Sequence, residues 1–234
     1  LLNHDIDPDC PLVCFGQVVG GDPFMLIGRE PRPDFQFKDL CGLKVGVVSE
    51  VPTPWMTMQD DLGRAGIDPA TIERGPTRTM SENVAALAAG ELDVIQVMEP
   101  QAAIALSGHD AHLWHRFSIR GEVAFTTFYA PRAFVRTNPE ICRALVAALE
   151  ASIEQLYSTP AEQVGALLRP WFPDVDAARL SEAVHGYQAA SLWTRDPAIA
   201  PAHLARLKAA LLSGELIRRD IPFESVVDES FLAQ

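Results

Sequence analysis

The stretch KVGVVSEVPTPW, residues 44–55, passes from a short apolar run into a turn that places Ser49, Thr53 and Trp55 among two prolines. A valine-rich run bounded by turn-forming residues is typical of a buried strand. In open α/β sheets, ligands bind beyond the carboxyl ends of strands, where the first N–H groups of the next helix are unpaired. Hydroxyl groups at Ser49 and Thr53 would add hydrogen-bond donors, and Trp55 would add a flat apolar wall. The alternative is that Thr53 only caps a helix and Trp55 packs in the core.

Apolar runs alternate with helical patterns on both sides of this stretch. We expect strands over residues 12–19, 23–28, 44–48, 72–77, 92–98 and 123–130. The helices between them are expected to run from Trp55 to Gly66, from a Ser81 cap to Gly90, and after Pro100. Repeated strand–helix–strand units indicate an α/β protein with a parallel sheet.

The second half of the chain is expected to be helical. Asn138 followed by Pro139 is a helix start signal, and Thr159 followed by Pro160 repeats it. Two further helices are expected over residues 178–188 and 203–214.

Composition excludes several classes of protein. The 234 residues, 48% of them hydrophobic, suffice for one large domain or two lobes. The apolar runs are shorter than the roughly 20 residues that span a bilayer, so we expect no transmembrane segment. A net charge of -12 argues against a nucleic-acid partner. Four cysteines are too few for a disulfide scaffold, and no signal peptide is expected at Leu1.

Further polar residues follow other predicted strands. Glu99 lies at a strand end before Pro100, where it would accept hydrogen bonds from a ligand or cap the next helix. Thr126 and Thr127 point to opposite faces of a strand, so that one would face a cleft unless both only reflect β-propensity.

Metal and catalytic signatures are weak. The histidines of GHDAHLWHRF have no carboxylate or cysteine that completes a zinc spacing, so we expect no metal site at His109, His112 and His115. The chain has no nucleophile elbow, Walker loop or dinucleotide fingerprint. These absences favour a binding module over an enzyme.

The order of the motifs resembles ABC-transporter substrate-binding proteins, in the group of nitrate, sulfonate, taurine and thiamine-pyrimidine-precursor binders. The matching pieces are Asp39–Gly42, Gly66–Pro69, Ala86–Leu87 with Gly90–Asp93, and Met98–Pro100. This resemblance implies the two-lobe type 2 periplasmic binding protein fold, with two hinge strands and ligand in the cleft. Lobe one is expected to comprise residues 1–28 and 119–234, lobe two residues 29–118, and the family's first βαβ segment is expected to be absent from the chain.

The resemblance also implies a function. It predicts a periplasmic or lipid-anchored receptor, usually a monomer, that binds a small-molecule ligand and delivers it to ABC permease subunits, without catalytic residues, cofactor or metal. Because Glu50 would repel a sulfonate or nitrate and Trp55 would stack on a ring, a heteroaromatic or mixed-charge solute is favoured over a simple anion. The candidate ligand-binding residues are Ser49, Glu50, Thr53, Trp55, Glu99, Thr126 and Thr127.

Two alternatives remain open. One is an enzyme similar to the pyrimidine synthase of thiamine biosynthesis, which requires a lysine-bound pyridoxal phosphate and a cysteine-rich iron motif. Neither pattern is recognisable in the sequence. The other is a ligand-sensing domain of a regulator, which a DNA-binding or signalling domain elsewhere in the parent chain would reveal.

Overall fold

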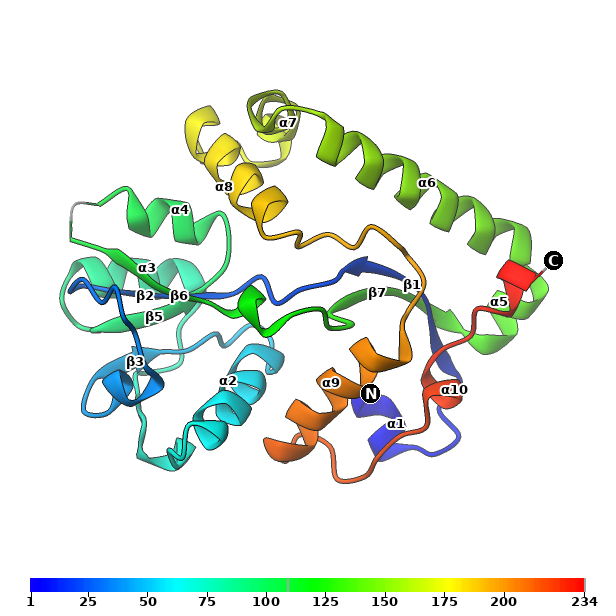
Figure 1. Cartoon of the computed structure of the whole chain (residues 1–234), viewed down its shortest axis with the longest axis horizontal. Coiled ribbons are helices and arrows are strands. Elements are labelled where there is room, and N and C mark those ends of the chain that lie inside the picture. The colour runs from blue at the N-terminus through cyan, green and yellow to red at the C-terminus, as the bar shows by residue number, and fades with distance from the viewer. Residues whose placement is uncertain (109, 234) are drawn as a thin grey trace. The chain divides into compact units, whose positions relative to one another are not determined.

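The computed structural model describes residues 1–108 and 110–233 and has a mixed α/β architecture, which confirms the predicted fold class (Figure 1). The chain forms two compact units. Unit 1 comprises Leu1–Asp22, Arg120–Pro160 and Gln188–Gln234, and unit 2 comprises Pro23–Ile119 and Ala161–Tyr187. Within the described part of the chain, no helix is both long enough and apolar enough to cross a membrane.

Unit 2 is built on a five-stranded sheet. Its strands are, in order across the sheet, β4 (Glu73–Arg74), β3 (Lys44–Gly46), β5 (Val94–Val97), β2 (Met25–Gly28) and β6 (His112–Arg116). β3 pairs in parallel with β4 and β5, but β2 is antiparallel to both β5 and β6. The expected parallel pairing is found among β3, β4 and β5, whereas the antiparallel pairing of β2 with β5 and β6 was not predicted. β2 pairs with strands that come much later in the chain, and the local alternation of strands and helices does not encode that pairing.

Helices cover both faces of this sheet. Those of unit 2 are α2 (Thr53–Arg64), α3 (Met80–Ala88), α4 (Gln101–Leu106), α7 (Ala161–Leu168) and most of α8 (Ala177–Ala189). Short 3-10 helices lie at Phe37–Leu40, Pro69–Thr71 and Arg169–Trp171, and a further one, Phe117–Arg120, ends at a residue of unit 1. Ile95 of β5 packs on α3 and α4, whereas the next residue, Gln96, hydrogen-bonds to Pro54 of α2. Successive side chains of a strand point to opposite faces, so α2 lies on the other face from α3 and α4.

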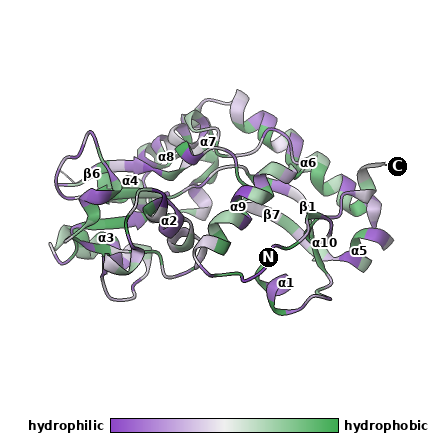
Figure 2. Ribbon diagram, turned by 60° about the horizontal axis from the view of Figure 1, so that its bottom comes forward, coloured by the Kyte–Doolittle hydropathy of each residue, from purple (hydrophilic) through white to green (hydrophobic). Residues whose placement is uncertain are grey.

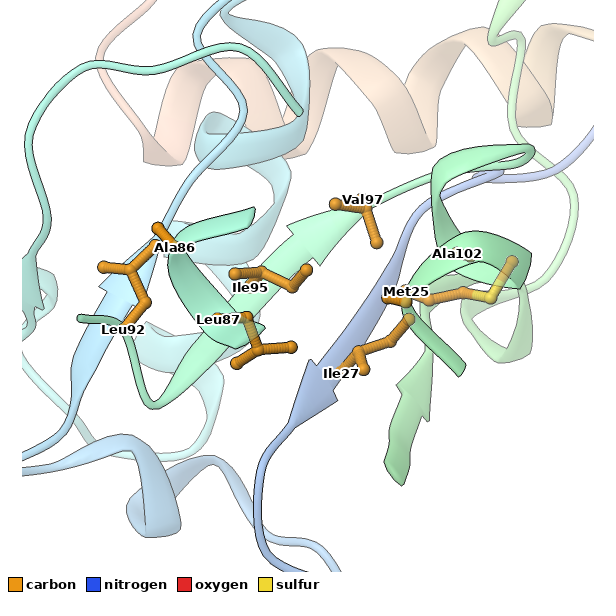
Figure 3. Packing of buried hydrophobic residues seen from close by; sticks show 9 residues of the cluster. Met25, Ile27, Ala86, Leu87, Leu92, Ile95, Val97 and Ala102 are labelled. Atoms are coloured by element: carbon orange, nitrogen blue, oxygen red, sulfur yellow. The ribbon is translucent and has the colours of Figure 1, made fainter. Parts of the chain in front are cut away.

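The core of unit 2 explains why the apolar runs became buried strands. Figure 3 shows side chains of β2 and β5 together with those of α3 and α4 in one cluster. Its buried members are Met25, Ile27, Ala86, Leu87, Leu92, Ile95, Val97, Ala102 and Ala105. At the start of α3 the side chain of Thr79 accepts a hydrogen bond from the Glu82 N–H, so Thr79, and not the predicted Ser81, is the cap. Glu82 completes a capping box there.

Unit 1 contains a two-stranded antiparallel ribbon of β1 (Leu12–Val19) and β7 (Thr126–Pro131). Its helices are α1 (Leu2–Ile6), α5 (Arg132–Thr137), α6 (Pro139–Ser158), α9 (Pro201–Ser213) and α10 (Phe223–Val226), with a final 3-10 turn at Ser230–Ala233. The predicted start signal of α6 is confirmed, because Asn138 is its N-cap residue and Pro139 opens it. Figure 2 shows hydrophilic and hydrophobic residues interspersed along α6, which buries Cys142, Val146 and Ile153.

The two units differ from the expected lobes in two segments and at Ile119, which was expected in lobe one and belongs to unit 2. Residues 23–28 and 161–187 were expected with residues 1–22, but both segments belong to unit 2. The first contains β2, which pairs on both sides within the five-stranded sheet. The second ends at Tyr187, whose ring packs on the core cluster of unit 2.

Candidate functional site

Three helices of unit 2 begin at one edge of its sheet. β3 and β5 are parallel neighbours, with Val45 opposite Val94, so their carboxyl ends meet at the same edge. The turns that follow them, residues 47–52 and 98–100, lead into α2 and α4, and the segment after β4 leads into α3. We call this region, with its two turns and three helix starts, the carboxyl edge.

Two buried amide side chains fix the turn 47–52. The Asn83 Nδ2 donates to the Val47 carbonyl at 3.1 Å. The Gln96 Oε1 accepts from the Val48 N–H at 3.5 Å, and its Nε2 donates to the Pro54 carbonyl at 3.0 Å. Both side chains are fully buried. They connect the turn to α3, which contains Asn83, and to β5, which contains Gln96. Sequence reasoning missed these residues, although a glutamine inside the apolar run VIQV was a usable signal.

Ser49 and Glu50 tie this turn to the start of α3. The Ser49 Oγ donates to the Arg78 carbonyl at 2.5 Å. One oxygen of Glu50 accepts from the Met80 N–H at 2.7 Å, and the other from the Ser49 N–H at 3.2 Å. The Glu50 carboxylate therefore sits at the positive end of the α3 dipole. Both side chains are exposed.

Thr53 and Trp55 lie in the first turn of α2. Thr53 is the first helical residue, and the N-cap residue is Pro52, so the capping role considered for Thr53 is not what the structure shows. Trp55 is only 7% exposed, and the Arg74 guanidinium lies 4.9 Å from the centre of its ring. This is a cation–π contact, which makes Trp55 part of the packing of unit 2. Its contact with a ligand stays a prediction.

Glu99 caps α4. Its Oε2 accepts from the Ala103 N–H at 2.9 Å, while its own N–H donates to the Tyr187 hydroxyl at 2.9 Å. Burial raises the pKa of the Glu99 carboxyl, against the opposing effects of the Ala103 N–H and the Arg116 charge. The structure therefore shows the capping role that the sequence had left as an alternative.

The two threonine candidates belong to unit 1. Thr126 is exposed on β7, whereas Thr127 is half-buried and its Oγ1 donates to the Cys14 Sγ at 3.1 Å. The candidates that the structure brings together at the carboxyl edge are thus Ser49, Glu50, Thr53, Trp55 and Glu99.

The histidine-rich segment forms β6, which sequence reasoning did not identify as a strand. The His115 ring lies 5.3 Å from that of Phe37 and 5.0 Å from that of Phe117, which gives it a packing role. Among residues 1–108 and 110–233 there is no group of three or more His, Cys, Asp and Glu side chains that could hold a metal. His109 lies outside the described residues.

Comparison with solved structures identifies the fold. The periplasmic aliphatic sulphonate binding protein SsuA from Escherichia coli is 18% identical, with a TM-score of 0.77 over 97% of this chain and 72% of that one. The alkanesulfonate-binding protein SsuA from Xanthomonas axonopodis pv. citri, bound to MOPS, is 13% identical, with a TM-score of 0.70 over 98% and 76%. The desulfurization enzyme DSZB, as a mutant in complex with biphenyl-2-sulfinic acid, is 16% identical, with a TM-score of 0.69 over 100% and 81%.

The fold is that of a type 2 periplasmic binding protein, as the sequence resemblance implied. The chain belongs to the NMT1/THI5-like family, whose profile matches residues 4–163. A search of curated proteins finds no match to the chain.

Proposed function

We propose that the chain is the solute-binding receptor of an ABC importer, located outside the cytoplasm, which binds a small organic ligand and delivers it to permease subunits. The observation that carries this proposal is the carboxyl edge of unit 2, where two strand-end turns and three helix starts gather around polar side chains. In this class of fold, binding sites lie at such edges and at domain interfaces. We expect Thr126 and Thr127 of unit 1 to contribute to ligand binding as well, and the receptor to be a monomer.

The hydrogen bonds of the carboxyl edge support a particular class of ligand. Glu50 already accepts from the first N–H of α3, and Glu99 accepts from an N–H in the first turn of α4. An incoming oxyanion would have to displace these carboxylates or lie beside them, and both alternatives are unfavourable. At α2, by contrast, no side chain caps the helix and no acidic residue stands in its first turn, so the acidic or carbonyl group of a mixed-charge solute would bind there. A heteroaromatic or mixed-charge solute, with hydrogen-bond donors for the two carboxylates, fits this arrangement better than nitrate or a simple sulfonate.

Fold alone does not separate a receptor from an enzyme, because binding proteins and DSZB share it. The proposal therefore needs a direct binding measurement. Native mass spectrometry of the purified chain will report any co-purified organic mass and the oligomeric state. Thermal shift will then be measured with four compounds: a thiamine-pyrimidine precursor, benzoate, MOPS and nitrate. We expect an organic compound to raise the melting temperature by several degrees, because ligand binding to the folded state adds to its stability.

Variants at Ser49, Thr53 and Trp55 test where the ligand binds. Trp55→Ala is expected to abolish the shift, and Trp171→Ala, at a 72% exposed tryptophan, is the matched control that keeps it. Because Trp55 is buried and its loss also weakens the fold, Ser49→Ala and Thr53→Ala test the same turn with smaller changes. A chain that carries no organic mass and is stabilised by none of the four compounds would contradict the proposed function.

A further inference from the structure

The antiparallel pairing of β2 with β5 stops just before the carboxyl edge. Met25 lies opposite Val97 in this ladder, and the Arg29 N–H donates to the Asp93 carbonyl at its other end. Hydrogen-bonded pairs alternate along an antiparallel ladder, so the next hydrogen-bonded position beyond Met25 and Val97 places Pro23 opposite Glu99. If the ladder continued, the Glu99 N–H would donate to the Pro23 carbonyl.

The structure places a side-chain hydroxyl at that position. The Tyr187 Oη accepts from the Glu99 N–H at 2.9 Å and donates to the Pro23 carbonyl at 3.3 Å. A phenol hydroxyl has one donor and can also accept. The Tyr187 hydroxyl therefore bonds to both backbone groups, the Glu99 N–H and the Pro23 carbonyl, that would bond to each other if the ladder continued. The Tyr187 ring packs on the core cluster of unit 2, which fixes where the hydroxyl can lie.

This bridge acts on the carboxyl edge through Glu99. The main chain of Glu99 is held by Tyr187, and its side chain is bound to the Ala103 N–H in the first turn of α4. A shift of the Glu99 backbone therefore moves both the turn 98–100 and the start of α4. Tyr187 lies in α8 and is 88 residues further along the chain than Glu99.

We propose that Tyr187 is a positioning residue for the ligand site: its hydroxyl sets the strand end at Glu99 and thereby the turn 98–100 that contacts the ligand. This inference rests on the proposed function for its ligand part. Its structural part, the coupling from Tyr187 through Glu99 to α4, can be tested without a ligand.

The first test is amide hydrogen exchange of the ligand-free chain by NMR. Tyr187→Phe removes only the hydroxyl, and Tyr157→Phe is the matched control, because the Tyr157 hydroxyl donates to the Trp193 carbonyl at 2.9 Å in unit 1. We expect Tyr187→Phe to lower the protection of the Ala103 amide about tenfold, in line with the loss of hydrogen bonds that hold Glu99. The Ile95 amide, inside β5, reports the overall stability and is expected to change less in Tyr187→Phe and equally little in the control.

A double mutant separates positioning from general weakening. Glu99→Ala removes the carboxylate that binds the Ala103 N–H, so Tyr187→Phe should have no further effect on this amide in that background. An Ala103 amide that keeps its protection in Tyr187→Phe, or loses no more than the Ile95 amide does, would overturn the positioning role whatever the ligand.

The second test uses whichever of the thiamine-pyrimidine precursor, benzoate, MOPS and nitrate stabilises the wild-type chain most. By calorimetry we expect Tyr187→Phe to weaken its binding about tenfold, the equivalent of one lost net hydrogen bond, and Tyr157→Phe to leave it unchanged. Selective loss of Ala103 protection with unchanged affinity would overturn the ligand part of the inference. If no compound binds the wild-type chain, the proposed function fails together with the ligand part, and the exchange data alone decide the coupling to α4.

Discussion

Replacing Gly28 by alanine tests how unit 2 packs beside its central strand. Gly28 ends β2 and is buried, and a methyl group built on it would lie 2.2 Å from Cε2 and 2.3 Å from Cζ2 of Trp114. Both distances are far inside van der Waals contact, and the atoms belong to a rigid indole ring. The ring would have to move as a whole.

The cost of that movement follows from how Trp114 is held. Its side chain lies on β6, is 8% exposed, and donates from Nε1 to the Glu30 carbonyl at 2.7 Å. Overpacking a core costs about 1–3 kcal/mol, and losing the hydrogen bond adds about 1 kcal/mol. We therefore expect Gly28→Ala to lower the free energy of unfolding by about 2–4 kcal/mol.

Urea unfolding followed by circular dichroism measures this loss. Gly63→Ala is the matched control, because a methyl group at Gly63 in α2 meets nothing within 4 Å. There we expect a gain of about 0.5–1 kcal/mol, since alanine is the better helix former.

A double-mutant cycle with Trp114→Ala tests whether the indole ring causes this loss of stability. Trp114→Ala destabilises the chain by itself, but it removes the ring atoms that the new methyl group would strike. Gly28→Ala should then cost little in this background. An equal cost with and without the tryptophan ring would show that the clash is not the cause.

Two further measurements test charged groups of the fold. Burial raises the pKa of the Glu99 carboxyl above 4.5 in the folded chain, so ionising this carboxyl opposes folding. As the pH rises from below 4.5 through the raised pKa, the urea midpoint of the wild type should therefore fall more than that of Glu99→Gln. Parallel curves over the pH series would count against this assignment. In unit 1, Arg132→Met should cost about 2–4 kcal/mol of unfolding free energy, because it leaves the Asp228 carboxylate without its bonded cation. Arg132 lies 3.0 Å from this carboxylate, which is 5% exposed. Arg136→Met is the control, with a contact of 3.6 Å from a 65% exposed side chain, and should cost less than about 1 kcal/mol; equal losses for the two arginines would contradict the reasoning.

The sequence predicted those features of the fold that depend on neighbouring residues. The apolar run 12–19 is β1 over its full length, and the start signal at Asn138 and Pro139 opens α6. Gly66 and Gly90 follow the ends of α2 and α3 with φ of +75° and +76°, a conformation that costs glycine little. At the candidate site, the sequence predicted that Ser49, Glu50, Thr53, Trp55 and Glu99 follow strand ends; Thr53 and Trp55 lie in the first turn of α2, and the contact of all five with a ligand stays a prediction.

Features that depend on distant partners were not predictable in this way. His112–Arg116 is a strand because it pairs with β2, although its own composition suggested solvated or structural histidines. At α3, Thr79 and Ser81 are both good capping residues, and only the position of Glu82 three residues after Thr79 favours the former. Glu50 was expected to repel anions. The structure shows a further role, because its carboxylate accepts a hydrogen bond from the N–H of Met80, thirty residues away.

Tyr187 shows most clearly where sequence reasoning ends. Nothing near it marks a site, because it lies in a helix whose pattern predicts only packing. Its importance comes from a coincidence of three elements: the register of β2 on β5 puts Pro23 opposite Glu99, the ladder stops there, and α8 brings a phenol hydroxyl to the gap. The partners of that hydroxyl are 88 and 164 residues away along the chain. The strand-end turn can be identified from sequence, but the group that fixes its position is set by the tertiary fold.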